Sequence, residues 1–354
     1  MDRTLPAQLW SLVKPRIVTL LCVTGVFSLL AAGGGSATVV AGFLVAGGCI
    51  AASAAAWNCW YDRKLDRRME RTADRPLPSG RLDHRVAAGF ATALLIVGTA
   101  VGLALLSAQA VAFMLLGFAS YVGLYTVLLK RRHWLGVVLG GSAGSFPVLA
   151  GWTTVRPLTL EPLVMALVVF AWTPAHAWAL AYVYRSEFAS VSIPTLPVVT
   201  TTTRVQRGVR YAVWSTVLTV VCMIPFAGAP YTVTAVVGSA LFVLGFRQFL
   251  RTGTERAAVR AFFTSNLFLA ALFGAWGVGG VAVDLAPWSQ LVALLVLPML
   301  FVGLWSARPG LRGVRGAVGG EWRIVTDRVA EAMATARLSY VRENDHLEGS
   351  GNRE

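Results

Sequence analysis

Long apolar segments recur along the whole chain, separated by short polar connections rich in Gly, Pro and charged residues. A helix needs roughly 20 apolar residues to cross the hydrocarbon core of a bilayer. The pattern offers ten such runs, at roughly 16–33, 37–57, 86–107, 109–129, 134–153, 160–183, 209–228, 231–250, 261–283 and 286–306. The pattern therefore predicts an all-α fold, a polytopic helical bundle that spans a membrane.

Composition and charge point the same way. Of the 354 residues 56% are hydrophobic and only 14% are charged, which is too little charge to cover a soluble globule. A net charge of +14 would suggest nucleic acid for a soluble chain, but the basic residues lie between apolar runs, so we expect no nucleic-acid partner. All Lys and Arg residues except Arg156 fall in alternate connections. Both termini and the connections 58–85 and 184–208 are therefore expected on the cytoplasmic side of the cell membrane.

The first apolar run follows basic residues and ends in small ones, as a signal peptide does, but it is long enough to span and we expect it to stay in the chain. Lys14 and Arg16 at its start either snorkel to lipid headgroups or reach a substrate phosphate. The four cysteines are scattered and indicate neither a disulfide framework nor a zinc site. We expect a cytoplasmic segment, a transmembrane domain, an additional transmembrane helix and a polar cytoplasmic tail, at 1–15, 16–285, 286–306 and 307–354.

A polar motif stands at the end of the second apolar run. Asn58, Asp62 and Asp66 are four residues apart, and on a helix positions i, i+4 and i+8 lie on one face. An amide and two carboxylates are hard oxygen ligands of the kind that hold Mg²⁺ together with substrate phosphates. The alternative is a solvated helix end whose acids pair with nearby arginines. Because ionisable groups at membrane depth are functional by default, we favour a site for a magnesium-bound diphosphate.

The connection after this motif is rich in arginine. Arginine binds phosphate oxygens through two N–H groups and keeps its charge. Some of this charge is the ordinary positive bias of cytoplasmic loops. Arg75 and Arg81 flank a Pro-Leu-Pro-Ser-Gly turn that fixes their direction, so we expect both to bind the diphosphate.

A second polar region lies at the end of the sixth apolar run. Pro174 is expected to break the helix and open a kink, and His176 would lie in that kink. Glu187 follows beyond the membrane edge, where it would act as a second acid. A single His in a bundle is more often a core residue with satisfied hydrogen bonds, and the neighbouring Trp and Tyr residues also fit an interfacial aromatic belt.

These motifs occur together in one known family. The block N-x-x-x-D-x-x-x-D-x-x-M-x-R-T-x-x-R-P-L from Asn58 onward, with KPRIVTL before it and WTPAHAWALAYVYRSEF after it, resembles the UbiA-type intramembrane prenyltransferases. Within that superfamily the chain most resembles the branch that makes haem O, over roughly residues 10–285. The resemblance implies a nine-helix core with a central cavity, here followed by a tenth span.

By that resemblance the protein is an enzyme that uses Mg²⁺ to transfer a farnesyl group from farnesyl diphosphate to a vinyl group of haem b. Its partners are then these two substrates and membrane lipids, with haem A synthase or oxidase assembly proteins as further candidates. We therefore expect catalysis by Asp62, Asp66 and Arg75, metal binding by Asn58, Asp62, Asp66 and Glu187, and substrate binding by Asn58, Lys14, Arg16, Arg71, Arg81, His176, Arg185 and Glu187.

Two alternatives stay open: prenyl transfer to a quinone or another lipid precursor, and a non-catalytic haem-handling or transport protein. The second motif is reduced to Ser186-Glu187, where members acting on quinone precursors usually have a fuller Asp-x-x-x-Asp. This favours haem as the acceptor. The Asp-rich motif occurs once in full, and not as the paired broken helices of a carrier, which argues against transport.

Overall fold

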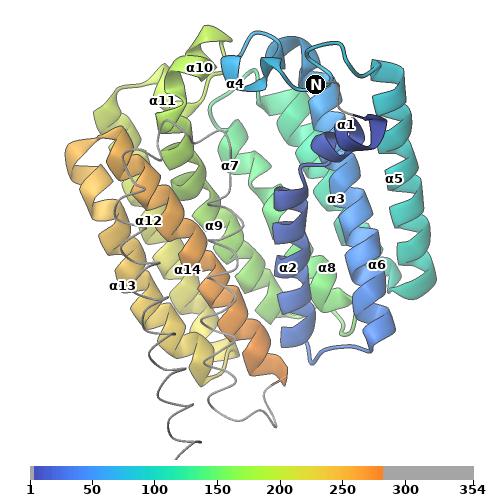
Figure 1. Ribbon diagram of the computed structural model, residues 1–354. Coiled ribbons are helices and arrows are strands. Elements are labelled where there is room, and N and C mark those ends of the chain that lie inside the picture. Colours follow the sequence, from blue (N-terminus) through green and yellow to red (C-terminus); the bar gives the residue numbers. More distant parts are fainter. Residues whose placement is uncertain (1–3, 282–354) are drawn as a thin grey trace, which may run out of the picture. The chain divides into compact units, whose positions relative to one another are not determined.

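The structure of the protein is a computed structural model that describes residues 4–281 (Figure 1). Within that range the chain forms helices and no strands, so the predicted all-α fold class is confirmed. The tenth predicted span, at 286–306, and the polar tail, at 307–354, lie outside the described residues.

The helices are, in chain order, α1 (Leu5–Leu12), α2 (Pro15–Ala31), α3 (Ala37–Asp66), α4 (Glu70–Ala73), α5 (His84–Leu105), α6 (Ala108–Ala119), α7 (Gly136–Gly140), α8 (Ser142–Thr153), α9 (Leu160–Val183), α10 (Arg185–Ser190), α11 (Leu196–Val199), α12 (Thr202–Met223), α13 (Ala229–Thr252) and α14 (Glu255–Val281). A π-helix, η1 (Ser120–Leu129), continues α6, and the 3-10 turn η2 (Ile224–Phe226) follows α12. Seven helices in the described range are long and apolar enough to cross a membrane. The bent pair α1 and α2, at 51° to each other, adds an eighth if it counts as one span. The core count of nine stays a prediction.

The fifth predicted span, 134–153, is divided between α7 and α8. Glycine at the division lets neighbouring helices come close: a Cβ on Gly140 would lie 2.5 Å from the Tyr125 ring, and one on Gly141 would lie 2.8 Å from Thr173. The helix break expected at Pro174 is not found, because α9 continues as one helix from Leu160 to Val183. Proline is tolerated inside membrane helices because neighbouring groups satisfy the backbone that it leaves unpaired.

Two groups of helices make up the bundle. In Figure 1, α2, α3, α5, α6 and α8 stand on one side, and α9, α12, α13 and α14 stand on the other. The largest buried cluster joins α8, α9 and α14 to α12 and α13, and it includes the fully buried rings of Phe242, Phe246 and Phe249. Leucine and valine side chains on the outer faces of α12 and α13 are exposed, as expected for surfaces that face lipid. The loop after α3, which contains α4, and the loop that contains α10 lie at the same end of the bundle (Figure 1). We call this end the loop end.

Helices α2 and α8 cross at a glycine pair. A Cβ on Gly151 would lie 2.0 Å from the carbonyl oxygen of Gly25, which is a backbone atom and not a movable side chain. We expect Gly151→Ala to lower the stability of the detergent-purified protein by about 1–3 kcal/mol. Gly274→Ala is the matched control, because a Cβ there meets nothing within 4 Å. Equal thermal melting curves for the two variants would contradict this close crossing.

Candidate active site

The three residues of the predicted motif occupy the last turns of α3 at the loop end. Asn58, Asp62 and Asp66 are all buried, with 4%, 1% and 7% of their surface exposed. Because they are spaced by four residues in one continuous helix, they lie on one face of it. Buried carboxylates require charged or hydrogen-bonding partners, so the neighbours of these residues define the site.

Asp62 contacts three side-chain donors, one on its own helix and two that directly follow η1. The ammonium group of Lys130 forms an ion pair with it, Nη2 of Arg131 lies 2.9 Å from its Oδ1, and Nδ2 of Asn58 donates to its Oδ2 at 3.0 Å. Burial lowers the pKa of Lys130, but Tyr125 and Asp62 raise it by more, so this pKa lies above its ordinary value and the amine stays charged at neutral pH. Asp62 is therefore surrounded by fixed positive charge.

Sequence reasoning counted Lys130 and Arg131 only as part of the positive bias of the loops. The fold brings both beside α3, because they directly follow η1, which packs against that helix. The Arg131 guanidinium also lies over the ring of Tyr61, 4.5 Å from its centre. In the sequence, the only indication that they belong to the site was their place in a connection predicted on the same side of the membrane as the Asn58, Asp62 and Asp66 motif.

Lys14 reaches the same site from the break between α1 and α2. Its Nζ donates to Oδ1 of Asn58 at 2.6 Å. Lys14 has a φ of 48°, in the left-handed region that non-glycine residues rarely adopt. Pro15 follows it, and a residue before proline is disfavoured in the right-handed helical region. Arg16 lies two residues further on, half-buried in the first turn of α2.

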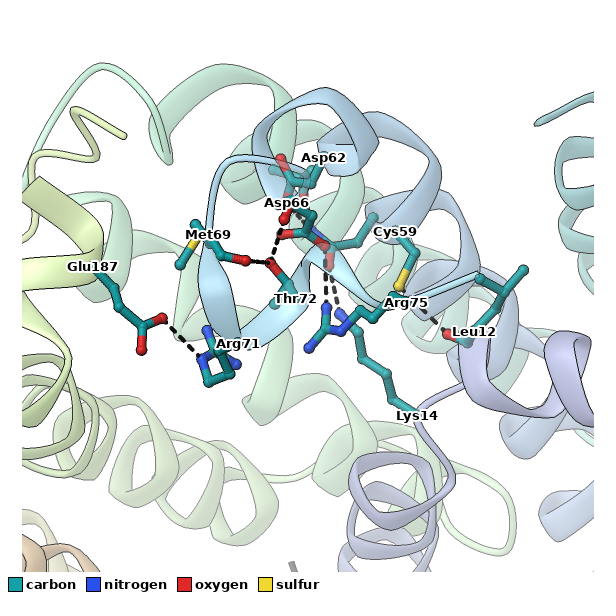
Figure 2. A network of polar contacts seen from close by, with 12 residues as sticks. Leu12, Lys14, Cys59, Asp62, Asp66, Met69, Arg71, Thr72, Arg75 and Glu187 are labelled. Carbon is teal, nitrogen blue, oxygen red and sulfur yellow. Dashed lines mark hydrogen bonds and ion pairs between the residues drawn. The ribbon is translucent and has the colours of Figure 1, made fainter. Parts of the chain in front are cut away.

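The loop after α3 folds back onto the motif. Nη1 of Arg75 lies 3.1 Å from Oδ2 of Asp66, and Oγ1 of Thr72 donates to the Asp66 carbonyl at 2.7 Å (Figure 2). The exposed Arg81 instead donates to the backbone carbonyl of Asp74, within its own loop. Of the two arginines expected to bind the diphosphate, Arg75 contacts Asp66, whereas Arg81 forms a hydrogen bond to the backbone of its own loop.

The second loop meets the first away from the aspartates. Oε2 of Glu187, on α10, lies 3.4 Å from Nε of Arg71, and the Arg71 guanidinium lies 5.0 Å from the centre of the Tyr184 ring (Figure 2). Beside this pair Met69 is buried against Val191, with Leu65 and Ile193 in the same apolar cluster.

The four predicted metal ligands are thus not gathered into one cluster. In residues 4–281 no three His, Cys, Asp or Glu side chains come together in a way that could hold a metal ion. Glu187 stands on the surface helix α10 and pairs with Arg71, the cation that the first loop brings to it. Arg185 likewise points elsewhere, with Nη1 2.8 Å from Oε1 of Glu255 at the start of α14.

His176 is on α9, and its ring contacts α14. Its ring stacks between Trp172 and Phe262, at centroid distances of 4.2 and 4.4 Å, and its Nδ1 is 2.8 Å from Oγ of Ser265. The Trp172 indole donates to the Ser265 carbonyl at 2.9 Å. The imidazole is therefore fixed in place by two aromatic rings and a hydroxyl.

An apolar cavity of about 260 Å³ opens beside Lys14 and extends into the bundle. Its walls come from α2, α3, α6, η1, α7 and α8, with Thr173 contributed by α9. Apart from Lys14 the lining is almost wholly apolar and includes several glycines and alanines. The polar network and this cavity therefore adjoin each other at Lys14.

Known proteins with similar sequences point to one family. The model of the UbiA prenyltransferase family matches residues 19–272. The chain is 37% identical over 283 residues to a protoheme IX farnesyltransferase from Rhodococcus jostii, covering 77% of this chain and 91% of that one. It is 40% identical over 254 residues to a protoheme IX farnesyltransferase from Kineococcus radiotolerans, covering 71% of this chain and 74% of that one.

Solved structures show the same fold at lower identity. A digeranylgeranylglyceryl phosphate synthase superposes with a TM-score of 0.65 at 16% identity, over 78% of this chain and 99% of that one. A UbiA homolog from Archaeoglobus fulgidus, bound to DMAPP and Mg²⁺, superposes with a TM-score of 0.60 at 16% identity, over 78% of this chain and 100% of that one. The chain belongs to the UbiA prenyltransferase family.

Proposed function

We propose that the protein transfers a farnesyl group from farnesyl diphosphate to a vinyl group of haem b, giving haem O for terminal oxidases. The observation that carries this proposal is the similarity to protoheme IX farnesyltransferases at 37% and 40% identity over most of the chain. The site is consistent with the reaction, since buried acids and cations adjoin an apolar cavity. Haem A synthase or oxidase assembly proteins are the partners we propose for passing the product on.

Breaking the allylic C–O bond leaves a carbocation and a diphosphate, so neutralising the leaving group is the main demand on the site. Lys14, Lys130 and Arg131 provide three cations next to Asn58 and Asp62. We propose that they turn from these side chains to the phosphate oxygens when the diphosphate binds. Positive charge held beside buried acids stabilises developing negative charge more than it would in bulk water.

The donors on α3 fit a magnesium ion of the kind that one or two carboxylates hold together with substrate phosphates. Asp62 and Asp66 supply two buried carboxylates on one helix face, and Asn58 supplies an amide oxygen. Both carboxylates already have cationic partners, so the site accommodates positive charge at these atoms. When bound, Mg²⁺ neutralises the diphosphate. We propose Asp62 and Asp66 as its ligands.

The apolar cavity is where we place the prenyl chain. It begins at Lys14, next to the proposed diphosphate site, and its lining excludes water from the farnesyl carbocation before the vinyl group adds to it. That addition leaves a cation on the haem substituent, which water then captures with loss of a proton to give the hydroxyl group of the product. We propose that His176, fixed between Trp172 and Phe262, contacts haem b. We also propose that the loop end faces the cytoplasm of the cell membrane, because basic residues concentrate in the connections there.

The purified protein with Mg²⁺, farnesyl diphosphate and haem b is the direct test. We expect hydroxyethylfarnesyl haem, identified by mass spectrometry, and none when Mg²⁺ is removed by chelation. A parallel reaction with a quinone precursor tests the other acceptor class. If only the quinone precursor is prenylated, the acceptor is a quinone precursor and not haem. If neither compound is prenylated, the proposal is overturned.

The Arg71–Glu187 pair gives a separate prediction about the second loop. We propose that Glu187 fastens this loop to the first, and does not bind the metal. Because both side chains are partly exposed, losing the pair is expected to cost at most about 1 kcal/mol. Arg71→Gln and Glu187→Gln should then lower activity by similar, small factors. If only Glu187→Gln raises the Mg²⁺ concentration needed for half-maximal activity, Glu187 is a metal ligand after all.

A further inference from the structure

The apolar cavity has an open end and a closed end. On α3 its lining residues run from Ala55, near the polar network, to Phe43, which is about 18 Å further along the helix axis. On α2 they run from Ile17 to Cys22, and Lys14 lines the cavity just before that helix. Ala150, on α8, lines the cavity next to Gly151, and both Gly151 and the Phe43 ring lie against Gly25 of α2. The cavity therefore ends at Phe43.

Phe43 is held in place from behind. Its side chain is 2% exposed, and its ring lies so close to Gly25 that a Cβ there would come within 2.3 Å of Cζ. At this level the α2 and α8 backbones meet, since a Cβ on Gly151 would lie 2.0 Å from the carbonyl oxygen of Gly25. Contact with the Gly25 backbone therefore holds the Phe43 ring in place at this end of the cavity.

One helical turn nearer the polar network, the α3 side of the cavity is formed by a glycine, which has no side chain. Gly47 lies four residues after Phe43 on α3 and also lines the cavity. A Cβ on Gly47 would lie 3.6 Å from Cε of Met114 and 4.0 Å from Cε1 of Phe43, which are ordinary contact distances. The cavity therefore has room at Gly47 and ends one helical turn later, at an aromatic ring.

We propose that Phe43 sets the length of the prenyl chain that the protein accepts, by forming the floor on which the end of the chain rests. The proposal rests on the proposed function, since it takes the cavity to hold the prenyl group. With the diphosphate held at Asn58, Lys14 and Asp62, the distance to Phe43 limits how many isoprene units fit. A smaller residue at position 43 deepens the cavity, and a larger one at position 47 shortens it.

The test is a competition among geranyl, farnesyl and geranylgeranyl diphosphates at equal concentrations, with Mg²⁺ and haem b. The ratio of the three prenylated haems is measured by mass spectrometry. Phe43→Ala should raise the ratio of geranylgeranyl to farnesyl product by at least about tenfold. Gly47→Leu should shift the ratio of geranyl to farnesyl product by a similar factor in favour of the shorter chain. Phe43→Leu, a milder truncation, serves if Phe43→Ala fails to fold.

Phe242→Ala is the matched control. It truncates an equally buried phenylalanine on α13 that does not line the cavity, so it loosens packing without deepening the pocket, and its product ratios should equal those of the wild type. Unchanged ratios in the folded Phe43 and Gly47 variants would overturn the proposal, as would a shift in Phe242→Ala equal to that in Phe43→Ala. If the wild type prenylates haem with none of the three diphosphates, the proposed function fails instead.

Discussion

Replacing Asp62 with asparagine is expected to lower kcat for haem farnesylation by about 10²- to 10³-fold, the usual cost of removing one group that stabilises a developing charge. Asp62 is the most buried of the three motif residues, and it contacts Lys130, Arg131 and Asn58. Asparagine keeps the size of the side chain and removes the charge proposed to hold the magnesium. The measurement is the steady-state rate of haem product formation at saturating farnesyl diphosphate.

Asp74→Asn is the matched control for this prediction. Asp74 lies in the arginine-rich loop close to the site, but its contact with Arg81 is made by its backbone carbonyl, which the substitution keeps. Its turnover should stay within a factor of about two, as for a surface substitution away from special features. Wild-type turnover by Asp62→Asn would contradict the proposal that the diphosphate site lies at the end of α3.

The polar face of α3 is the part of the site that sequence predicts best. A spacing of four residues and an apolar run before it determine both the helix and the face, without knowledge of any other element. The structure adds that α3 continues well past the second predicted span at 37–57, so that Asn58, Asp62 and Asp66 lie within one helix. Local periodicity is enough for such a feature because all its residues belong to one element.

The cations around that face were not predictable in the same way. Lys130 and Arg131 lie more than sixty positions from Asp62 in sequence and look like any other basic loop residues. Only the packing of η1 against α3 brings them to the carboxylate. Sequence could rank Lys14 as a candidate, but its contact with Asn58 depends on the bend between α1 and α2.

Pairing between loops is the least predictable feature. Glu187 was expected beside the aspartates because an acid in the second loop suggests a metal ligand. The structure instead places it on Arg71, and the apolar cluster of Met69 and Val191 joins the two loops next to the pair. Which opposite charge an exposed acid meets depends on loop packing, which has no periodic signal in the sequence.

Lys130→Met is expected to lower kcat/KM for farnesyl diphosphate by about 10²-fold or more, because it removes a charge proposed to bind the leaving group. Methionine keeps most of the length of the apolar stem. The change also leaves the buried Asp62 carboxylate with one cation fewer, and breaking a buried ion pair from one side costs about 3–5 kcal/mol of stability. Activity and stability should therefore fall together in this variant.

The double variant Lys130→Met with Asp62→Asn separates these two effects. Because it removes the carboxylate along with its partner, most of the lost thermal stability should return, while activity stays as low as in Asp62→Asn alone. Lys130→Arg keeps the charge and should retain more activity than Lys130→Met. Arg132→Met, at the exposed neighbouring position, should leave both measurements unchanged. If Lys130→Met loses stability but its remaining folded fraction has wild-type kcat/KM, Lys130 serves only to hold Asp62 in the fold.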